Sequence, residues 1–393
     1  MNELAHTTRL PRAAPARVLA CGAYLKNRAC LVDGDQVHWS PLHGDLGEAA
    51  NCAALERSIE SLLSRALGPL QAVAHDLHPD FHSTRVALAL AEQMQVPAIG
   101  VQHHHAHIGV ALAEHAVAGP VIGLALDGVG LGDDGSAWGG EVLWVNGLAA
   151  AHQWQRLDHL VPLALPGADA AAREPWRMAA AALFALGRGD EIEARFAPAV
   201  GAPAARGVHT MLQRDLQCPR SSSAGRWFDA AAGALALSVR QAFEAEAAMT
   251  LEVRAREWLQ AHPEFELPWT SLYLRPLLAE LFTLADSGSQ AQAQGAAMFH
   301  LALAGGLAHR AIEAARTHGT HTVVVGGGCF ANRVLTERLG AALQRAGLGV
   351  FQPQDAGCGD AGLALGQAWI AACAVRHGQA LAVQCAPSVA REA

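Results

Sequence analysis

Four histidines lie within five consecutive positions of this sequence: His103, His104, His105 and His107. An apolar run at residues 96–101 precedes them and predicts a buried strand, and Gly119 ends the pattern, so the residues between predict a short helix. On a helix His103 and His107 lie one turn apart on one face. Two imidazoles placed in this way can bind one metal ion, although the glutamate that a zincin helix carries is missing. The alternative is a polar helix start whose histidines are only solvated or capping groups.

A second candidate site is the glycine-rich segment at residues 126–135, which follows an apolar run. A strand that ends in Asp127 and Gly128 and opens into such a loop lets the backbone approach an anion closely, and its carboxylates can hold a metal ion. Segments of Asp and Gly are also ordinary turns, which is the alternative for this one.

Two further glycine-rich segments occur later in the chain. At residues 323–333 an apolar strand, three glycines and a helix start would present bare backbone N–H groups to a phosphate or a nucleotide. The spacing of these glycines is not that of the Rossmann or Walker motifs. In residues 355–366, Asp360 would lie at a helix N-terminus, where it is either a cap or the carboxylate that completes a two-histidine metal site.

The composition is that of a large globular protein. The 393 residues suffice for two domains, at about 100–200 residues per domain. A net charge of −8 argues against bulk nucleic-acid binding, and we expect neither a membrane span nor a secretory signal. The eight cysteines form no C-x-x-C pair, so they imply neither a zinc knuckle nor a disulfide framework. These features predict a cytoplasmic protein that contacts no membrane and no nucleic acid.

The two halves of the chain repeat one order of elements. Each half predicts a strand, a loop, a second strand, a hairpin turn and a third strand: 18–23, 29–32 and 37–40 in the first half, and 121–126, 141–145 and 148–155 in the second. Alternating helices and strands follow each hairpin. This order indicates an α/β fold of two related lobes, with the actin-like or sugar-kinase-like (ribonuclease-H-like) architecture and a nucleotide cleft between the lobes. The alternative is two unrelated α/β domains that share short hairpins.

The domain boundaries follow from these elements. We expect a flexible tail at residues 1–16, a first lobe with the histidine helix at 17–118, a second lobe with a helical insertion at 119–378, and a tail at 379–393. Gly, Pro and Ala dominate residues 187–223, which predicts an insertion with a mobile loop.

Six segments of the sequence resemble the HypF family, the carbamoyltransferases of nickel-iron hydrogenase maturation: residues 76–84, 103–108, 126–141, 173–178, 221–229 and 323–332. The resemblance runs from about Val18 to Ala371. It covers the C-terminal module of that family, which is related to the TsaD-type tRNA threonylcarbamoyl transferases. Family members usually begin with an acylphosphatase-like domain, a zinc segment and a YrdC-like domain, to which nothing in this sequence corresponds.

The resemblance also implies roles for individual residues. It implies zinc or iron bound by His103, His107 and Asp360, with Asp127 as a further contact, and it makes His103, His107 and Asp127 the catalytic candidates. The resemblance implies that the phosphates of ATP or carbamoyl adenylate lie near four glycines, Gly128, Gly130, Gly327 and Gly328. It implies that the ribose or base lies near Gly225, Asp229 and Asn332.

The sequence departs from the expected pattern at two places. Ser222 stands where the tRNA enzymes have an aspartate, so the ribose contacts are expected to differ. The Glu-Gly pair of the family appears as Glu244 and Ala245, which we expect to be tolerated.

The activity implied by the resemblance is a carbamoyl transfer. In the family, carbamoyl phosphate and ATP yield carbamoyl adenylate, and the module passes the carbamoyl group to the C-terminal cysteine of a HypE-type partner for cyanide synthesis. Without a YrdC-like domain, the adenylate is expected from elsewhere, from a longer paralogue or by another route from carbamoyl phosphate and ATP. Three alternatives remain: a tRNA threonylcarbamoyl transferase, which the acidic charge disfavours, a non-catalytic nucleotide- or carbamoyl-phosphate-binding assembly factor, and a sugar kinase, for which no basal aspartate is found.

Overall fold

The computed structural model describes residues 6–378. The first lobe contains a six-stranded sheet whose strands, in spatial order, are β1 (His6–Arg9), β4 (Gln36–Trp39), β3 (Cys30–Asp33), β2 (Val18–Ala20), β5 (Ala72–Asp76) and β6 (Ala98–Val101). The pairs β1–β4, β4–β3 and β3–β2 are antiparallel, whereas β2–β5 and β5–β6 are parallel. Helices α1 (Ala49–Leu63) and α2 (His82–Met94) pack on one face of this sheet.

The second lobe contains a seven-stranded sheet. Its strands are β7 (Val121–Leu131), β8 (Ala137–Asn146), β9 (Ala150–His159), β10 (Leu163–Ala164), β11 (Arg220–Ser221), β12 (Thr322–Gly326) and β13 (Gly349–Phe351). Strands β7, β8 and β9 form an antiparallel meander, and β12 pairs in parallel with β7 and with β13. This sheet therefore repeats the plan of the first one, in which a meander is extended by parallel strands.

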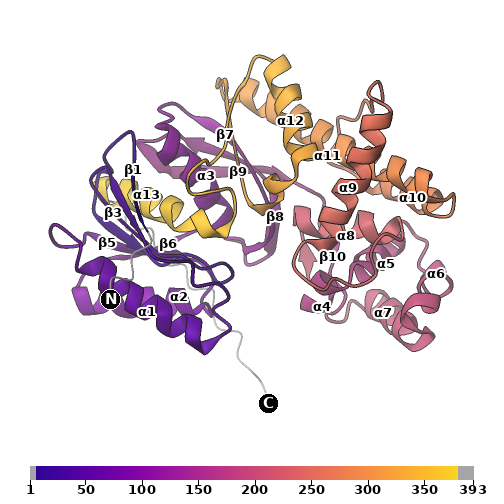
Figure 1. Cartoon of the computed structure of the whole chain (residues 1–393), viewed down its shortest axis with the longest axis horizontal. Coiled ribbons are helices and arrows are strands. Elements are labelled where there is room, and N and C mark those ends of the chain that lie inside the picture. The colour runs from indigo at the N-terminus through magenta and orange to yellow at the C-terminus, as the bar shows by residue number, and fades with distance from the viewer. Residues whose placement is uncertain (1–5, 379–393) are drawn as a thin grey trace.

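Helices α3 (His103–His115) and α13 (Leu363–Arg376) lie between the two sheets (Figure 1). Successive side chains of a strand point to opposite faces of its sheet. The side chains on the inner face of each sheet, for example Val18 and Val121, pack against these two helices. The helices touch closely, because Gly366 of α13 lies directly on the backbone of Ala106, where any side chain would collide. The two lobes thus share one apolar core.

A layer of helices covers the outer face of the second sheet and extends away from it (Figure 1). It consists of α4 (Asp169–Arg173), α5 (Pro175–Ala185), α6 (Glu191–Val200), α7 (Ala202–Arg214), α8 (Ala224–Ala234), α9 (Glu246–Ala261), α10 (Arg275–Ala285), α11 (Ser289–Thr317) and α12 (Arg333–Arg345). Two short 3₁₀ turns, η1 (Gly328–Ala331) and η2 (Asp360–Gly362), precede α12 and α13. The buried rings of Trp176, Trp227 and Phe299 fill the spaces that small alanines leave between these helices.

The structure confirms the α/β fold with two related lobes, and it corrects three details. Residues 6–9 of the expected flexible tail form a strand paired with β4. The segment 187–223, expected to contain a mobile loop, is mostly the helices α6 and α7, because its alanines favour helix and Pro203 falls at the start of α7; Pro198 is accommodated within α6. The glycine-rich segment 126–135 is largely strand, since β7 continues to Leu131. The expected tail at 379–393 lies outside the described residues.

Two expectations concern the whole chain. Within residues 6–378, no helix combines the length and the apolar character needed to cross a bilayer. The seven cysteines of the described part are all free thiols, and Cys385 lies outside it.

Candidate metal centre

The histidine helix begins where β6 ends. Gln102 is the N-cap of α3, and its side-chain oxygen accepts a hydrogen bond from the backbone N–H of His105 at 2.8 Å. Residues 103–113 of this helix are buried. The side chains of His103 and His107 point from α3 toward Asp127, a residue of β7, and toward Asp360, the first residue of η2.

Four side chains from three distant parts of the chain meet at this point. Nε2 of His107 lies 2.9 Å from Oδ2 of Asp127, and Nε2 of His103 lies 3.2 Å from the same oxygen. Oδ1 of Asp360 lies 3.4 Å from Nε2 of His103 and 3.5 Å from Nε2 of His107. The histidines are almost completely buried, whereas the carboxylates retain partial exposure. The cluster is therefore open to solvent on its carboxylate side.

These distances fit the first coordination sphere of a metal ion. Zinc binds histidine nitrogen and carboxylate oxygen at about 2.0–2.2 Å, so ligand atoms around a tetrahedral ion lie about 3.3 Å apart. The four candidate ligand atoms lie within 4.8 Å of one another, and the histidine–carboxylate distances are close to the expected separation. Two imidazoles and two carboxylates form a donor set suited to zinc or iron. The residues present therefore fit the metal that the sequence predicts.

The electrostatics of the cluster support the same conclusion. Burial lowers the pKa of His103 and of His107, but the neighbouring carboxylates outweigh burial and raise both values above the ordinary histidine value. Burial raises the pKa of Asp127 and Asp360, but hydrogen bonds and charge from the two histidines lower both values below the ordinary range. Without a cation, protons on the imidazoles balance the buried carboxylates, and a bound cation would replace those protons.

One functional residue was missed by sequence reasoning. Asp76, at the end of β5, accepts a hydrogen bond from Nδ1 of His103 at 2.8 Å, and it is completely buried. It belongs to a segment that resembles the HypF family, but a lone aspartate 27 positions before the histidine gives no signal of this contact. Its place follows from the parallel pairing of β5 with β6, which brings Asp76 next to Val101 and thus close to His103.

The other two histidines of the run do not reach the cluster. Nε2 of His105 donates to the carbonyl of Ala151 at 2.7 Å, and its ring stacks on Trp154. Burial lowers the pKa of His105 to about 3, so it is a neutral structural group. Nδ1 of His104 accepts from the side-chain amide of Gln102 at 3.0 Å, and burial lowers the pKa of His104 well below the ordinary value. Of these four histidines, His103 and His107 contact the carboxylates of the cluster, and His104 and His105 do not.

Comparisons with known proteins show the family to which the chain is similar. A model of the HypF Kae1-like domain matches residues 13–114, and a model of the second subdomain of the Kae1-like carbamoyltransferase domain matches residues 123–367. A carbamoyltransferase HypF homolog of Cupriavidus necator is 58% identical over 365 residues, which are 91% of this chain and 92% of that protein. The chain belongs to the HypF carbamoyltransferase family. Members of this family are enzymes, and the match extends over most of the chain.

Several other members of the HypF family are about twice as long as this chain. Carbamoyltransferase HypF2 of the same organism is 47% identical, and the alignment covers 92% of this chain but 47% of HypF2. A crystal structure of full-length HypF in a phosphate- and nucleotide-bound form is 29% identical, with a TM-score of 0.79, and the match covers 93% of this chain and 47% of that one. The HypF of T. kodakarensis gives a TM-score of 0.81 at 28% identity, covering 94% of this chain and 49% of that one.

The glycines predicted to receive nucleotide phosphates surround Asp127 in this HypF-family chain. The backbone N–H groups of Gly128 and Gly328 both donate to Oδ1 of Asp127, at 2.8 Å and 3.3 Å. Gly327 has a φ of +102° and lies against the backbone of Leu126, so a side chain there would be strained and would collide. Gly128 has open space where a side chain would be. The phosphate role of these residues stays a prediction.

Gly130 and Gly225 have visible packing reasons for being glycine. A Cβ atom on Gly130 would lie 2.8 Å from three atoms of the His103 side chain, so this glycine allows β7 to pass the ring. A Cβ atom on Gly225 would lie 3.1 Å from the Cα atom of Gly128, so Gly225 allows α8 to approach the strand. Both residues therefore pack beside the cluster of candidate metal ligands.

Asp229 and Asn332, predicted near the ribose or base, are engaged in contacts of their own. Burial raises the pKa of Asp229 to about 6, even though Arg226 pairs with its carboxylate at 2.7 Å. Asn332 is the N-cap of α12, and its amide donates to Nε2 of His300 at 2.9 Å. Their nucleotide contacts also stay predictions.

A hydrogen-bond network holds the backbone beside Asp127. The buried carboxylate of Glu141 accepts from the backbone N–H groups of Gly139 and Gly140, from the hydroxyl of Ser222 and from the Arg156 guanidinium. The next residue, Ser223, donates its hydroxyl to the carbonyl oxygens of Asp127 and Gly128. Ser222, where the tRNA enzymes have an aspartate, is thus part of this network.

One ion pair between the lobes lies near the carboxylates of the cluster. Lys26, in the loop after β2, pairs with Glu244 of the second lobe at 2.8 Å. Ala245 next to it has a φ of +63°, so the change from the glycine of the family to alanine is tolerated only with backbone strain.

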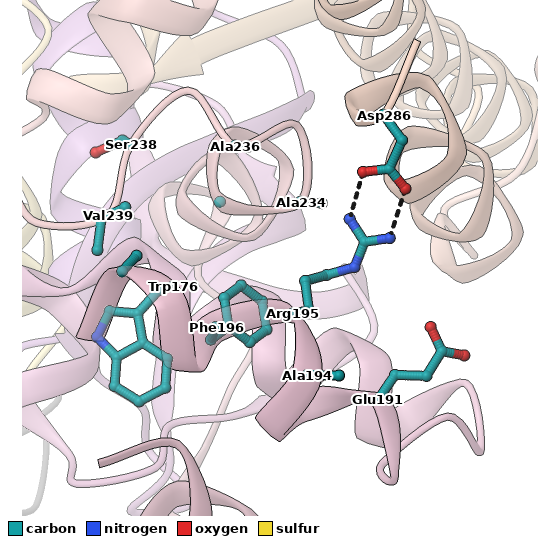
Figure 2. A pocket seen from close by; sticks show the side chains of 12 residues that line it. Trp176, Glu191, Ala194, Arg195, Phe196, Ala234, Ala236, Ser238, Val239 and Asp286 are labelled. Carbon is teal, nitrogen blue, oxygen red and sulfur yellow. Dashed lines mark hydrogen bonds and ion pairs between the residues drawn. The ribbon is translucent and has the colours of Figure 1, made fainter. Parts of the chain in front are cut away.

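Figure 2 shows a separate cavity of about 470 Å³ within the helical layer. Trp176, Phe196 and Val239 form its apolar wall, and Arg195 at its rim pairs with Asp286 at 2.9 Å. No predicted site residue lines this cavity, so it is distinct from the metal centre.

Proposed function

We propose that this chain transfers a carbamoyl group from carbamoyl adenylate, made from carbamoyl phosphate and ATP, to the C-terminal cysteine of a HypE-type partner, as a step in cyanide-ligand synthesis. The observation that carries the proposal is the cluster of His103, His107, Asp127 and Asp360 between the two lobes of a HypF-type fold. One neighbouring structure, of full-length HypF, is described as phosphate- and nucleotide-bound, which is consistent with a nucleotide substrate.

The transfer is an acyl substitution at the carbamoyl carbon. The cysteine thiolate attacks this carbon and forms an S–C bond, the C–O bond to the phosphate breaks, and AMP leaves with the electron pair of that bond. A zinc or iron ion held by the four residues would supply a Lewis acid for the carbamoyl or phosphoryl oxygen.

The protein's own groups prepare this step. The N–H groups of Gly128 and Gly328 orient one oxygen of Asp127, and the other oxygen faces His103 and His107. Open space beside Gly128 lets a substrate approach the backbone at this point. Substrate reaching this space would lie on the carboxylate side of the cluster, which is the solvent-accessible side.

Mass spectrometry of the partner's C-terminal peptide tests the proposal. The purified chain, loaded with zinc or ferrous iron, is incubated with the HypE-type partner, carbamoyl phosphate and ATP, and in a second arm with carbamoyl adenylate. Carbamoylation of the cysteine in the second arm alone would mean that adenylation occurs elsewhere, and transfer in both arms would mean that this chain also makes the adenylate.

His107→Ala should abolish the transfer in either arm, because it removes a buried group of the cluster. His309→Ala, on the surface of α11, is the matched control and should transfer as the unmodified chain does. Transfer that survives in His107→Ala, or no transfer by the unmodified chain from carbamoyl adenylate, would refute the proposed function.

A further inference from the structure

Asp76 lies directly behind the metal centre, away from the side where substrate would enter. It ends β5, and its backbone pairs with Val101 at the end of β6, two residues before His103. Its side chain is buried together with the ring of His103. This position brings a carboxylate to the ring nitrogen that does not face the cluster.

The orientation of the Asp76 carboxylate is determined by two hydrogen bonds. Oδ1 accepts from the backbone N–H of His78 at 3.0 Å, and Oδ2 accepts from Nδ1 of His103 at 2.8 Å. The backbone oxygen of Asp76 accepts from the hydroxyl of Thr84 and from Nδ1 of His75. The group is therefore held at both its side chain and its main chain.

A carboxylate can only accept, so Nδ1 of His103 must carry a proton. With that proton on Nδ1, the lone pair of a neutral imidazole is on Nε2, the atom that lies 3.2 Å from Asp127 and 3.4 Å from Asp360. A metal ion binds histidine through this lone pair. The contact thus decides which nitrogen of His103 can be a ligand.

We propose that Asp76 is a positioning residue that sets the tautomer and the ring orientation of His103 for metal binding. The inference rests on the metal centre of the proposed function. Its alternative is a purely structural role, in which Asp76 only satisfies buried polar groups.

Two substitutions of Asp76 distinguish the positioning role from the structural role, because the two roles predict opposite orders of metal affinity for them. In Asp76→Asn the backbone N–H of His78 still requires an acceptor, so the amide oxygen stays in the place of Oδ1 and the NH₂ group faces Nδ1 of His103. Nδ1 must then accept, the proton moves to Nε2, and the ligand lone pair is lost. In Asp76→Ala the ring is free to adopt either tautomer, but the buried Nδ1 of His103 and the partly buried N–H of His78 lose their partner.

A positioning role therefore predicts that Asp76→Asn binds metal more weakly than Asp76→Ala. A purely structural role predicts the reverse, because asparagine keeps the volume and the number of hydrogen bonds. Outer contacts of this kind change metal affinity by about 10- to 100-fold. We expect about 10-fold weaker binding for Asp76→Ala and about 100-fold for Asp76→Asn.

The experiment measures zinc affinity by competition with a chelating dye, on chains stripped of metal, and thermal unfolding of the metal-free chains. Asp80→Asn, an exposed carboxylate of the same segment, is the control and should bind zinc as the unmodified chain does. The metal-free Asp76→Asn chain should unfold at a higher temperature than Asp76→Ala, although it binds zinc more weakly.

Each outcome is decisive. If Asp76→Asn binds zinc as tightly as the unmodified chain, or more tightly than Asp76→Ala, the positioning role is refuted while the proposed function stands. Failure of Asp76→Asn to fold also refutes it, because the argument requires that the amide satisfies the metal-free core. If the unmodified chain binds no zinc or ferrous iron, the metal centre of the proposed function is refuted, and the inference with it.

Discussion

Replacing Gly130 by alanine should disturb the metal centre through contact with one of its histidines. The new Cβ atom would lie 2.8 Å from the Cβ, Cγ and Cδ2 atoms of His103. Carbon atoms in ordinary contact lie about 3.5–4.0 Å apart, so the ring or the strand must move by about 0.7 Å. Asp76 holds the ring from the other side at 2.8 Å, which limits where it can go.

A shift of this size exceeds the tolerance of a metal site. Ligand distances in metal sites hold to within about 0.2 Å, so we expect Gly130→Ala to weaken zinc binding by about 10- to 100-fold. Overpacking of this kind should also lower the free energy of unfolding of the metal-free protein by about 1–3 kcal/mol. Competition with a chelating dye measures the first quantity, and denaturant unfolding measures the second.

Gly128→Ala is the matched control. It adds the same methyl group to the same strand, but nothing lies within 4 Å of the new atom. Zinc affinity should therefore stay the same, and any loss should appear only in nucleotide binding. The reasoning is refuted if Gly130→Ala binds zinc as tightly as the unmodified chain, or if Gly128→Ala weakens zinc binding as much.

Three further predictions concern stability. Glu141→Gln removes the buried carboxylate that pairs with the partly exposed Arg156 at 2.7 Å and should cost about 2 kcal/mol in denaturant unfolding; a cost below about 0.5 kcal/mol would contradict the role of the network. Ala245→Gly relieves a φ of +63° and should stabilise the fold by about 0.5–1 kcal/mol, whereas Ala248→Gly within the same helix should destabilise it. Burial lowers the pKa of His300 to about 4. The Nε2 atom of this buried ring accepts a hydrogen bond from Asn332, and protonation at Nε2 would break that bond. Between about pH 6.5 and 4 the unfolded chain therefore binds a proton at this histidine that the folded chain does not bind. Lowering the pH through this range should reduce the free energy of unfolding of the unmodified chain by about 3 kcal/mol more than that of His300→Gln. Denaturant unfolding at a series of pH values measures both losses, and equal losses would count against this account.

Local patterns were enough to predict most of the elements. The apolar run before the histidines and the spacing of His103 and His107 predicted a helix with both rings on one face, and α3 has this form. The Asp-Gly and Asn-Gly turns predicted the two hairpins. These signals are reliable because they depend on backbone preferences and side-chain periods within a few residues.

Contacts between distant segments gave no such signal. The strand β1 pairs with β4, which lies about 30 residues later, and its four polar residues show no apolar alternation that would distinguish it from a tail. Ser222 reaches Glu141 across 81 positions, and Asp76 reaches His103 across 27. Each of these pairs depends on which strands lie side by side, and that order is a property of the whole sheet.

By itself the sequence determined the family, the α/β class and the candidate donors, because these depend on short patterns and on residue types. Only the tertiary structure decided which donors meet. Among four adjacent histidines, helix geometry and packing turned His103 and His107 toward Asp127 and buried His105 against Trp154. The parallel pairing of β5 with β6 and of β7 with β12 then brought Asp76, the histidine helix and Asp127 to the same point, where sequence separation no longer matters.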